Sequence, residues 1–196
     1  MRESRERLLF APYPRPKQGN ENADPIYLAI GRALSSWEAT EDNLARLFSH
    51  IVNQNKLQMP VMRAYLLIKS ARNRKELITE TGRTFLEFFP SEEAAHGLKI
   101  VSETYQRGSD WRNEIAHGIV AGHVDFSGSY SGYYLGPSMT SFKKRDDNFR
   151  SKYLYSNKEI GAFCDENSRF QSNISELTEA ITAAYRSGSD VAFSRY

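Results

Sequence analysis

The stretch SDWRNEIAHG, residues 109–118, ends in a glycine at the point where the pattern of the chain changes. Upstream of it, apolar residues recur at the three- and four-residue spacing of an amphipathic helix. Gly118 stands where helices commonly end in a glycine. Downstream, β-forming residues alternate with glycines and serines in IVAGHVDFSGSYSGYYLGPSM, residues 119–139. The stretch therefore predicts the end of a long helix that begins near Ser91, followed by a β-hairpin or flap.

Three other parts of the chain carry helical periodicity. The first runs over residues 24–52, where Asp-Pro supplies an N-cap and a proline suited to the first helical position. A second helix begins near residue 60; the sequence leaves open whether it continues or kinks before the shorter helical piece RTFLEFF, residues 83–89. The last helix begins at Asn157 and carries a clear apolar face.

These segments predict an all-α fold, an antiparallel bundle of four to five helices with a small β-hairpin or flap inserted before the last helix. The flap covers about residues 119–156. Prolines and polar residues make residues 1–22 an irregular N-terminal arm. Residues 23–196 then form a single helical domain whose tail frays after residue 186.

The composition narrows the class of protein. Lys and Arg number 26 and Asp and Glu 24, a balance that excludes a protein coating nucleic acid non-specifically. The longest apolar run, about five residues, is far short of the roughly 20 that cross a membrane, and we expect no signal peptide. Cys164 is the single cysteine, so an intrachain disulfide and a thiolate metal cluster are excluded. We expect a soluble, cytoplasmic protein without a membrane partner.

The motif itself combines residue types suited to phosphate chemistry. Asn113 and His117 are four positions apart, so they share a helix face, and a long Arg112 side chain can reach the space beside His117. Cleavage of RNA through its 2′-hydroxyl needs a group to take that proton, a group to assist the leaving 5′ oxygen, and a positive charge on the phosphorane. Histidine can move the protons and arginine can supply the charge. This chemistry needs no metal, and neither a metal-ligand cluster nor a cofactor motif is visible, so we expect no cofactor.

The motif RNEIAH, residues 112–117, resembles the signature of the HEPN superfamily, in which an arginine, often followed by a polar residue, precedes a histidine by four to six residues. The layout of residues 24–186 is similar to that of many bacterial HEPN-like proteins. The resemblance implies a helical bundle that forms a homodimer, with the motifs of both subunits facing one cleft. It also implies a metal-independent endoribonuclease of a toxin–antitoxin or defence system, with an antitoxin or another protein as a partner. The resemblance further implies that Arg112 and His117 are catalytic and that Asn113 supports them.

Two other interpretations of the motif stay open. In the first, the chain is a non-catalytic HEPN-like module that binds a protein partner, a nucleotide or RNA through Arg112 and Asn113. In the second, the motif only completes the helix, because Arg and His meet the negative end of a helix favourably and Gly118 then caps it.

Glu41 interrupts the apolar stripe of the first helix. It either faces the bundle interior, where it would pair with Arg112 and fix the guanidinium, or lies on a solvated flank.

The flap and the loop after it combine aromatic and basic residues. This pattern is typical of a surface on which single-stranded RNA stacks. The other interpretation, which the β propensity of tyrosine favours, is that the tyrosines attach the flap to the bundle or to a second subunit. The residues concerned are Tyr130, Tyr133 and Tyr134, followed by Lys143, Lys144 and Arg145.

Overall fold

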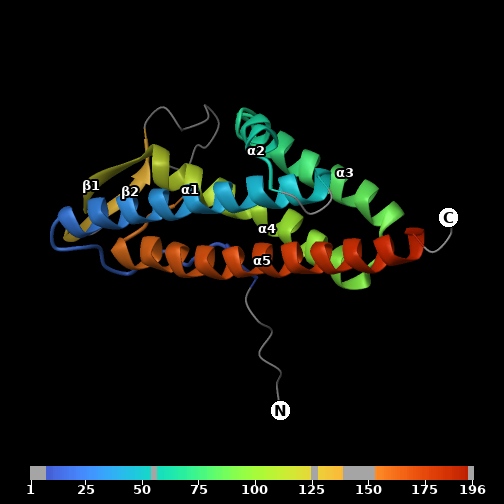
Figure 1. Cartoon of the computed structure of the whole chain (residues 1–196). Coiled ribbons are helices and arrows are strands. Elements are labelled where there is room, and N and C mark those ends of the chain that lie inside the picture. Colours follow the sequence, from blue (N-terminus) through green and yellow to red (C-terminus); the bar gives the residue numbers. More distant parts are fainter. Residues whose placement is uncertain (1–7, 54–56, 125–127, 139–152, 194–196) are drawn as a thin grey trace, which may run out of the picture. The chain divides into compact units, whose positions relative to one another are not determined.

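The structure, a computed structural model, describes residues 8–53, 57–124, 128–138 and 153–193, the last five of them by backbone alone. Within these ranges the chain forms five helices and one two-stranded antiparallel sheet (Figure 1). The helices and strands are α1 (Asp24–Val52), α2 (Met59–Leu66), α3 (Ala71–Phe88), α4 (Glu92–His117), β1 (Gly118–Val124), β2 (Tyr130–Pro137) and α5 (Asn157–Phe193). The predicted helical fold with a small β-hairpin before the last helix is thus confirmed.

Local sequence signals explain most of the helix ends. The question left open after residue 60 is settled by a break, because Ser70 caps a new helix by accepting a hydrogen bond from the backbone N–H of Asn73 at 3.4 Å. That helix, α3, runs on through the piece RTFLEFF, which was expected to stand apart, and ends before Pro90. The last helix, α5, continues to Phe193, past residue 186, after which the tail was expected to fray.

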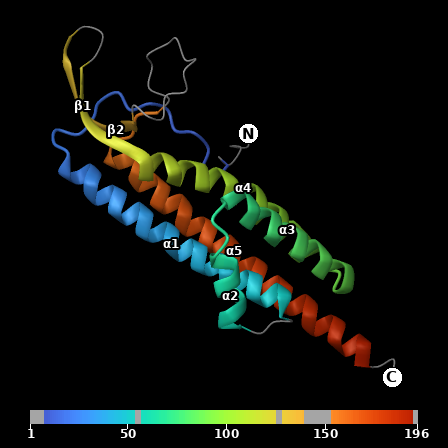
Figure 2. The same cartoon turned by 90° about the horizontal axis from the view of Figure 1, so that it is seen from above.

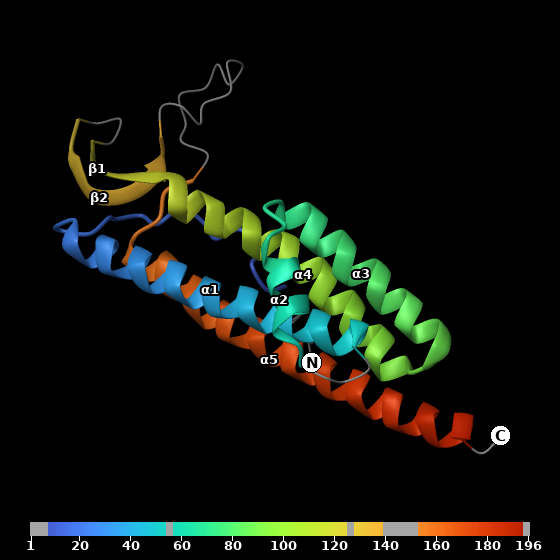
Figure 3. The same ribbon diagram turned by 45° about the horizontal axis from the view of Figure 1, so that its top comes forward.

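The described residues divide into two compact units, and α1, α4 and α5 contribute residues to both. Unit 2 comprises residues 38–109 and 168–196. Within it α4 runs opposite to α1 and to α5, and α3 runs opposite to α4 (Figure 3). In this unit α1 and α5 run in the same direction, so not every pair is antiparallel. A Cβ at Gly82 of α3 would come within 2.7 Å of Leu98 of α4, which shows how closely these two helices pack.

Unit 1 comprises residues 1–37 and 110–167. Its hairpin consists of β1 and β2 (Figure 2). Ala121 pairs with Tyr134, and the register shifts between His123 and Val124. The outer edge of β2 is also paired, because short bridges join Asn20 to Tyr133 and Tyr155 to Leu135. Segments distant in the sequence therefore extend the hairpin on one side.

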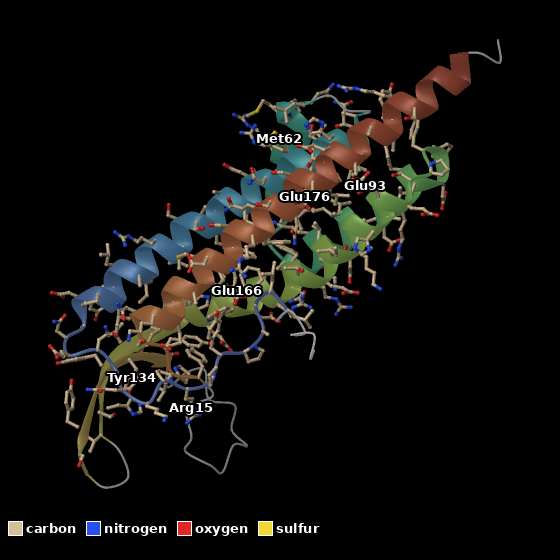
Figure 4. The ribbon with its side chains drawn as sticks, turned by 90° about the horizontal axis from the view of Figure 1, so that it is seen from below. Arg15, Met62, Glu93, Tyr134, Glu166 and Glu176 are labelled. Atoms are coloured by element: carbon tan, nitrogen blue, oxygen red, sulfur yellow. The ribbon has the colours of Figure 1, made fainter. Side chains whose placement is uncertain are left out.

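The N-terminal arm, residues 8–22 of which are described, is irregular as predicted, and it contributes to the core of unit 1. Phe10 is buried, with its ring against Trp37, Trp111 and Phe163 at centroid distances of 5.4–6.3 Å. The carboxylate of Glu166 accepts hydrogen bonds from the backbone N–H of Phe10 and, at 2.8 Å, from the hydroxyl of Tyr13. Figure 4 shows Glu166 on α5 next to the arm. The arm is therefore held by both apolar and polar contacts.

Candidate functional site

The last two turns of α4 carry the motif and are anchored by its buried side. Trp111 and Ile115, four positions apart, are 6% and 1% exposed. Because a helix turns by about 100° per residue, the residues between and after Trp111 and Ile115 point away from this buried face. Asn113 and His117 are exposed and Arg112 is half-buried. Burial of one face thus presents the other, polar face of the helix end to solvent.

Arg112 and Asn113 are brought into contact on this face. The guanidinium Nη1 of Arg112 donates a hydrogen bond to Oδ1 of Asn113 at 3.4 Å. Neighbouring residues of a helix do not normally face each other, so this contact depends on the length of the arginine side chain. His117 lies one turn beyond Asn113 on the same face and forms no hydrogen bond with the residues that the structure describes.

Glu114 is a further polar residue of the motif that sequence reasoning missed. Its side-chain Oε2 accepts a hydrogen bond from the hydroxyl of Tyr155 at 2.6 Å, and its backbone oxygen accepts one from Tyr153 at 2.9 Å. The two tyrosine rings are stacked, with centroids 4.9 Å apart. Alternate residues of an extended segment point the same way, so the spacing in KYLYS was a signal for this pair.

Burial and the neighbouring glutamate determine the electrostatics beside the motif. Burial raises the pKa of Tyr153 to about 12, and the charge of Glu114 adds to the shift. The pKa of Tyr155 is also raised, by burial first and then by its hydrogen bond to Glu114. Both hydroxyls therefore stay protonated near neutral pH and remain donors.

The rings around Trp111 fix the helix end. They come from the arm, from the segment before α5 and from α5 itself, at centroid distances of 5.2–6.3 Å: Phe10, Tyr13, Tyr155 and Phe163. Trp111 directly precedes Arg112, so this packing restrains the backbone from which the candidate site projects.

Glu41 lies in unit 2 and has other partners. It is 6% exposed, so it faces the interior of unit 2 and does not lie on a solvated flank. Its Oε2 lies 2.7 Å from Nη1 of Arg74, and its Oε1 accepts a hydrogen bond from Tyr105 at 2.9 Å. An acid on an apolar stripe signalled the burial, whereas no local pattern indicated Arg74 as its partner. A contact of Glu41 with Arg112 stays a prediction.

The expected RNA-contacting residues are only partly described. Tyr133 is half-buried in β2, where its ring meets that of the exposed Tyr130 edge-on at 6.0 Å. Tyr134 is buried, with His123 edge-on to its ring. The basic part of this surface, Lys143, Lys144 and Arg145, lies outside the described residues.

Comparisons of this chain with known protein families, curated proteins and solved structures gave no match. Among the described residues, none of the helices combines the length and apolar composition needed to cross a bilayer. The same residues contain no group of three or more histidine, cysteine or carboxylate side chains placed to hold a metal ion.

Proposed function

We propose that this chain is a metal-independent endoribonuclease of HEPN type. The observation that carries the proposal is the pairing of Arg112 with Asn113 beside an exposed His117 on the open face of the α4 end. A permanently charged guanidinium and an imidazole that can accept or donate a proton thus share one accessible helix end.

In the proposed reaction the 2′-oxygen of RNA attacks the adjacent phosphorus while its proton passes to His117. The new oxygen–phosphorus bond forms, the bond to the 5′ oxygen breaks, and that oxygen takes a proton from an imidazolium. Arg112 stabilises the negative charge of the phosphorane, and Asn113 holds a phosphate oxygen or the imidazole. The products are a 2′,3′-cyclic phosphate and a 5′-hydroxyl.

The resemblance of the motif to HEPN proteins extends the proposal to a cytoplasmic homodimer. One histidine cannot accept one proton and donate another at the same moment, and a second copy facing the same cleft supplies the second imidazole. An exposed helix end is also a surface that a protein antitoxin can cover, which fits a role in a toxin–antitoxin or defence system.

The test is cleavage of a mixed RNA pool in EDTA by wild type, Arg112→Ala and His117→Ala. We expect cleavage by wild type and a loss of about 10²–10⁴-fold in His117→Ala, the usual cost of removing a general acid or base. The matched control is His96→Ala, since His96 is an exposed histidine of the same helix away from the motif. Full activity in His117→Ala, or equal loss in His96→Ala, contradicts the mechanism.

Thermal melting of the same variants separates a site from a helix-end role. If Arg112 serves chemistry, its removal leaves the melting temperature unchanged or raises it, because functional residues are commonly not optimal for stability. A clear fall in the melting temperature of Arg112→Ala indicates that the motif mainly completes the helix.

One observation favours a second candidate function, a non-catalytic module that binds RNA, a nucleotide or a protein. A general base is usually oriented by a third group, and no hydrogen bond from the described residues orients His117. In this case wild type does not cleave RNA, and its binding to a ligand or partner depends on Arg112 but not on His117.

A further inference from the structure

A groove of about 520 Å³ lies in unit 2 between the second half of α1 and the later turns of α5. The two helices run side by side there (Figures 2 and 4). Asn43, Arg46 and His50 line the groove from α1, and Arg186 is among the residues that line it from α5. On α1 these side chains are three and four positions apart, which places them on one helix face.

The groove is rich in groups that bind phosphate. Arg46 is exposed and forms no ion pair with the residues that the structure describes. Arg186 adds a second guanidinium from the other helix, and His50 adds a half-buried imidazole. A guanidinium presents a planar fork of N–H donors that matches phosphate oxygens, so two forks from two helices can hold one phosphate group from two sides.

Glu179 limits the kind of phosphate that fits. Its carboxylate lines the same groove. A polyanion such as RNA, laid along the groove, would bring a phosphate towards this carboxylate and be repelled. A compact molecule with a single phosphate and several hydroxyls avoids the repulsion, because a carboxylate accepts hydrogen bonds from hydroxyls. The volume of the groove lies within the range of small-molecule sites, about 300–1,000 Å³.

We propose that this groove binds a small phosphate monoester of the sugar-phosphate class. Arg46, Arg186 and His50 take the phosphate, and Glu179 takes hydroxyls of the sugar. The proposal is independent of the ribonuclease proposal, because every residue it uses lies in unit 2 and its test does not measure RNA cleavage.

The first test is titration calorimetry of the full chain with ribose 5-phosphate and with inorganic phosphate. We expect saturable binding at one site per chain, with ribose 5-phosphate the tighter ligand. Arg46→Ala and Arg186→Ala each weaken binding by about 10- to 100-fold, the usual effect of losing a charged hydrogen bond. Arg169→Ala is the matched control, since Arg169 is an exposed arginine of α5 outside the groove. Absence of saturable binding, or an equal loss in Arg169→Ala, overturns the proposal.

Two further variants test the place and the chemistry of the site. Ala183 lines the groove and is exposed, so Ala183→Trp fills the space without changing the charge and should abolish binding. Glu179→Gln should tighten binding of inorganic phosphate and remove the preference for ribose 5-phosphate. Circular dichroism verifies that each variant is folded. Unchanged binding in Ala183→Trp overturns the proposal, and so does a short single-stranded RNA that binds more tightly than ribose 5-phosphate and is lost in Ala183→Trp.

Discussion

Two arginines of α3 form ion pairs of similar length in very different surroundings. Arg72 meets Glu76 at 2.9 Å with both side chains exposed, at 80% and 58%. Arg74 meets Glu41 at 2.7 Å, where the two side chains are only 16% and 9% exposed. Arg74 also donates hydrogen bonds to the backbone oxygens of Ile68, at 2.6 Å, and Leu66, at 3.0 Å. One side chain thus ties the α2–α3 corner to a buried acid of α1.

We expect Arg74→Ala to lower the free energy of unfolding by about 3–5 kcal/mol, because it leaves the charge of Glu41 buried without its cation. Arg72→Ala, the matched control, should cost less than about 1 kcal/mol, as exposed pairs do. Urea unfolding followed by circular dichroism measures both. Equal effects of the two substitutions would show that the burial of the Glu41 pair does not determine its contribution.

At the scale of elements, the hairpin and the arm depend on one close backbone approach. Gly132 of β2 has a φ of +106°, and a Cβ there would lie 2.8 Å from the backbone carbon of Gly19 in the arm. The next residue of the arm, Asn20, exchanges backbone hydrogen bonds of 2.8 and 2.9 Å with Tyr133. Gly128, before the hairpin's second strand, also has a positive φ of +84°, but a Cβ there would meet nothing within 4 Å.

Gly132→Ala should therefore release the arm, and Gly128→Ala should not. Both variants incur the cost of a left-handed backbone, about 1–2 kcal/mol, but only Gly132→Ala forces the arm away from β2. Limited trypsin digestion with mass spectrometry reports this directly, because Lys17 lies in the arm, is exposed and is not followed by a proline. We expect faster cleavage after Lys17 in Gly132→Ala alone; equal rates in both variants would mean that the contact with Gly19 does not hold the arm.

The same elements show what a single sequence can predict. Some helix ends are determined by residues only a few positions away in the sequence, so these ends were predictable. The residues concerned are Asp24-Pro25, Pro90 and Gly118. The position of Arg112, Asn113 and His117 on one helix end follows from spacing alone. The partners of Glu41 and Glu114 do not, since Arg74 and Tyr155 reach them across 33 and 41 positions of the chain. The contact of Phe10 with Glu166 spans 156 positions and is equally invisible to local patterns.

At the scale of the whole molecule, both units bury tyrosine hydroxyls beside carboxylates. In unit 2, burial raises the pKa of Tyr65 and of Tyr105; the charge of Glu41 adds to both shifts. In unit 1, burial and Glu114 raise the pKa of Tyr153 and Tyr155 above the ordinary value of 10.0. The folded state therefore holds these protons more tightly than the unfolded state does.

This difference predicts a loss of stability in alkali. The stabilisation is fully present below about pH 10, the pKa of a tyrosine in the unfolded chain. It is lost as the pH rises through the pKa values that these tyrosines have in the folded chain, because the unfolded chain then releases protons that the folded chain retains. For Tyr153 the window runs from 10.0 to about 12. We expect the melting temperature to fall steadily above pH 10, with tyrosinate absorbance from the buried hydroxyls appearing only as the protein unfolds.

Tyr153→Phe isolates one contribution to this alkaline loss. The variant keeps a ring against Tyr155 but loses the hydrogen bond to the backbone oxygen of Glu114, so near neutral pH it should be less stable by about 1 kcal/mol. Because phenylalanine has no proton to lose, the difference from wild type should shrink as the pH rises through the window from 10.0 to about 12. Tyr27→Phe, at a residue that is 57% exposed, should follow wild type at every pH. A constant difference between Tyr153→Phe and wild type would mean that the Tyr153 hydroxyl ionises as readily in the folded chain as in the unfolded one.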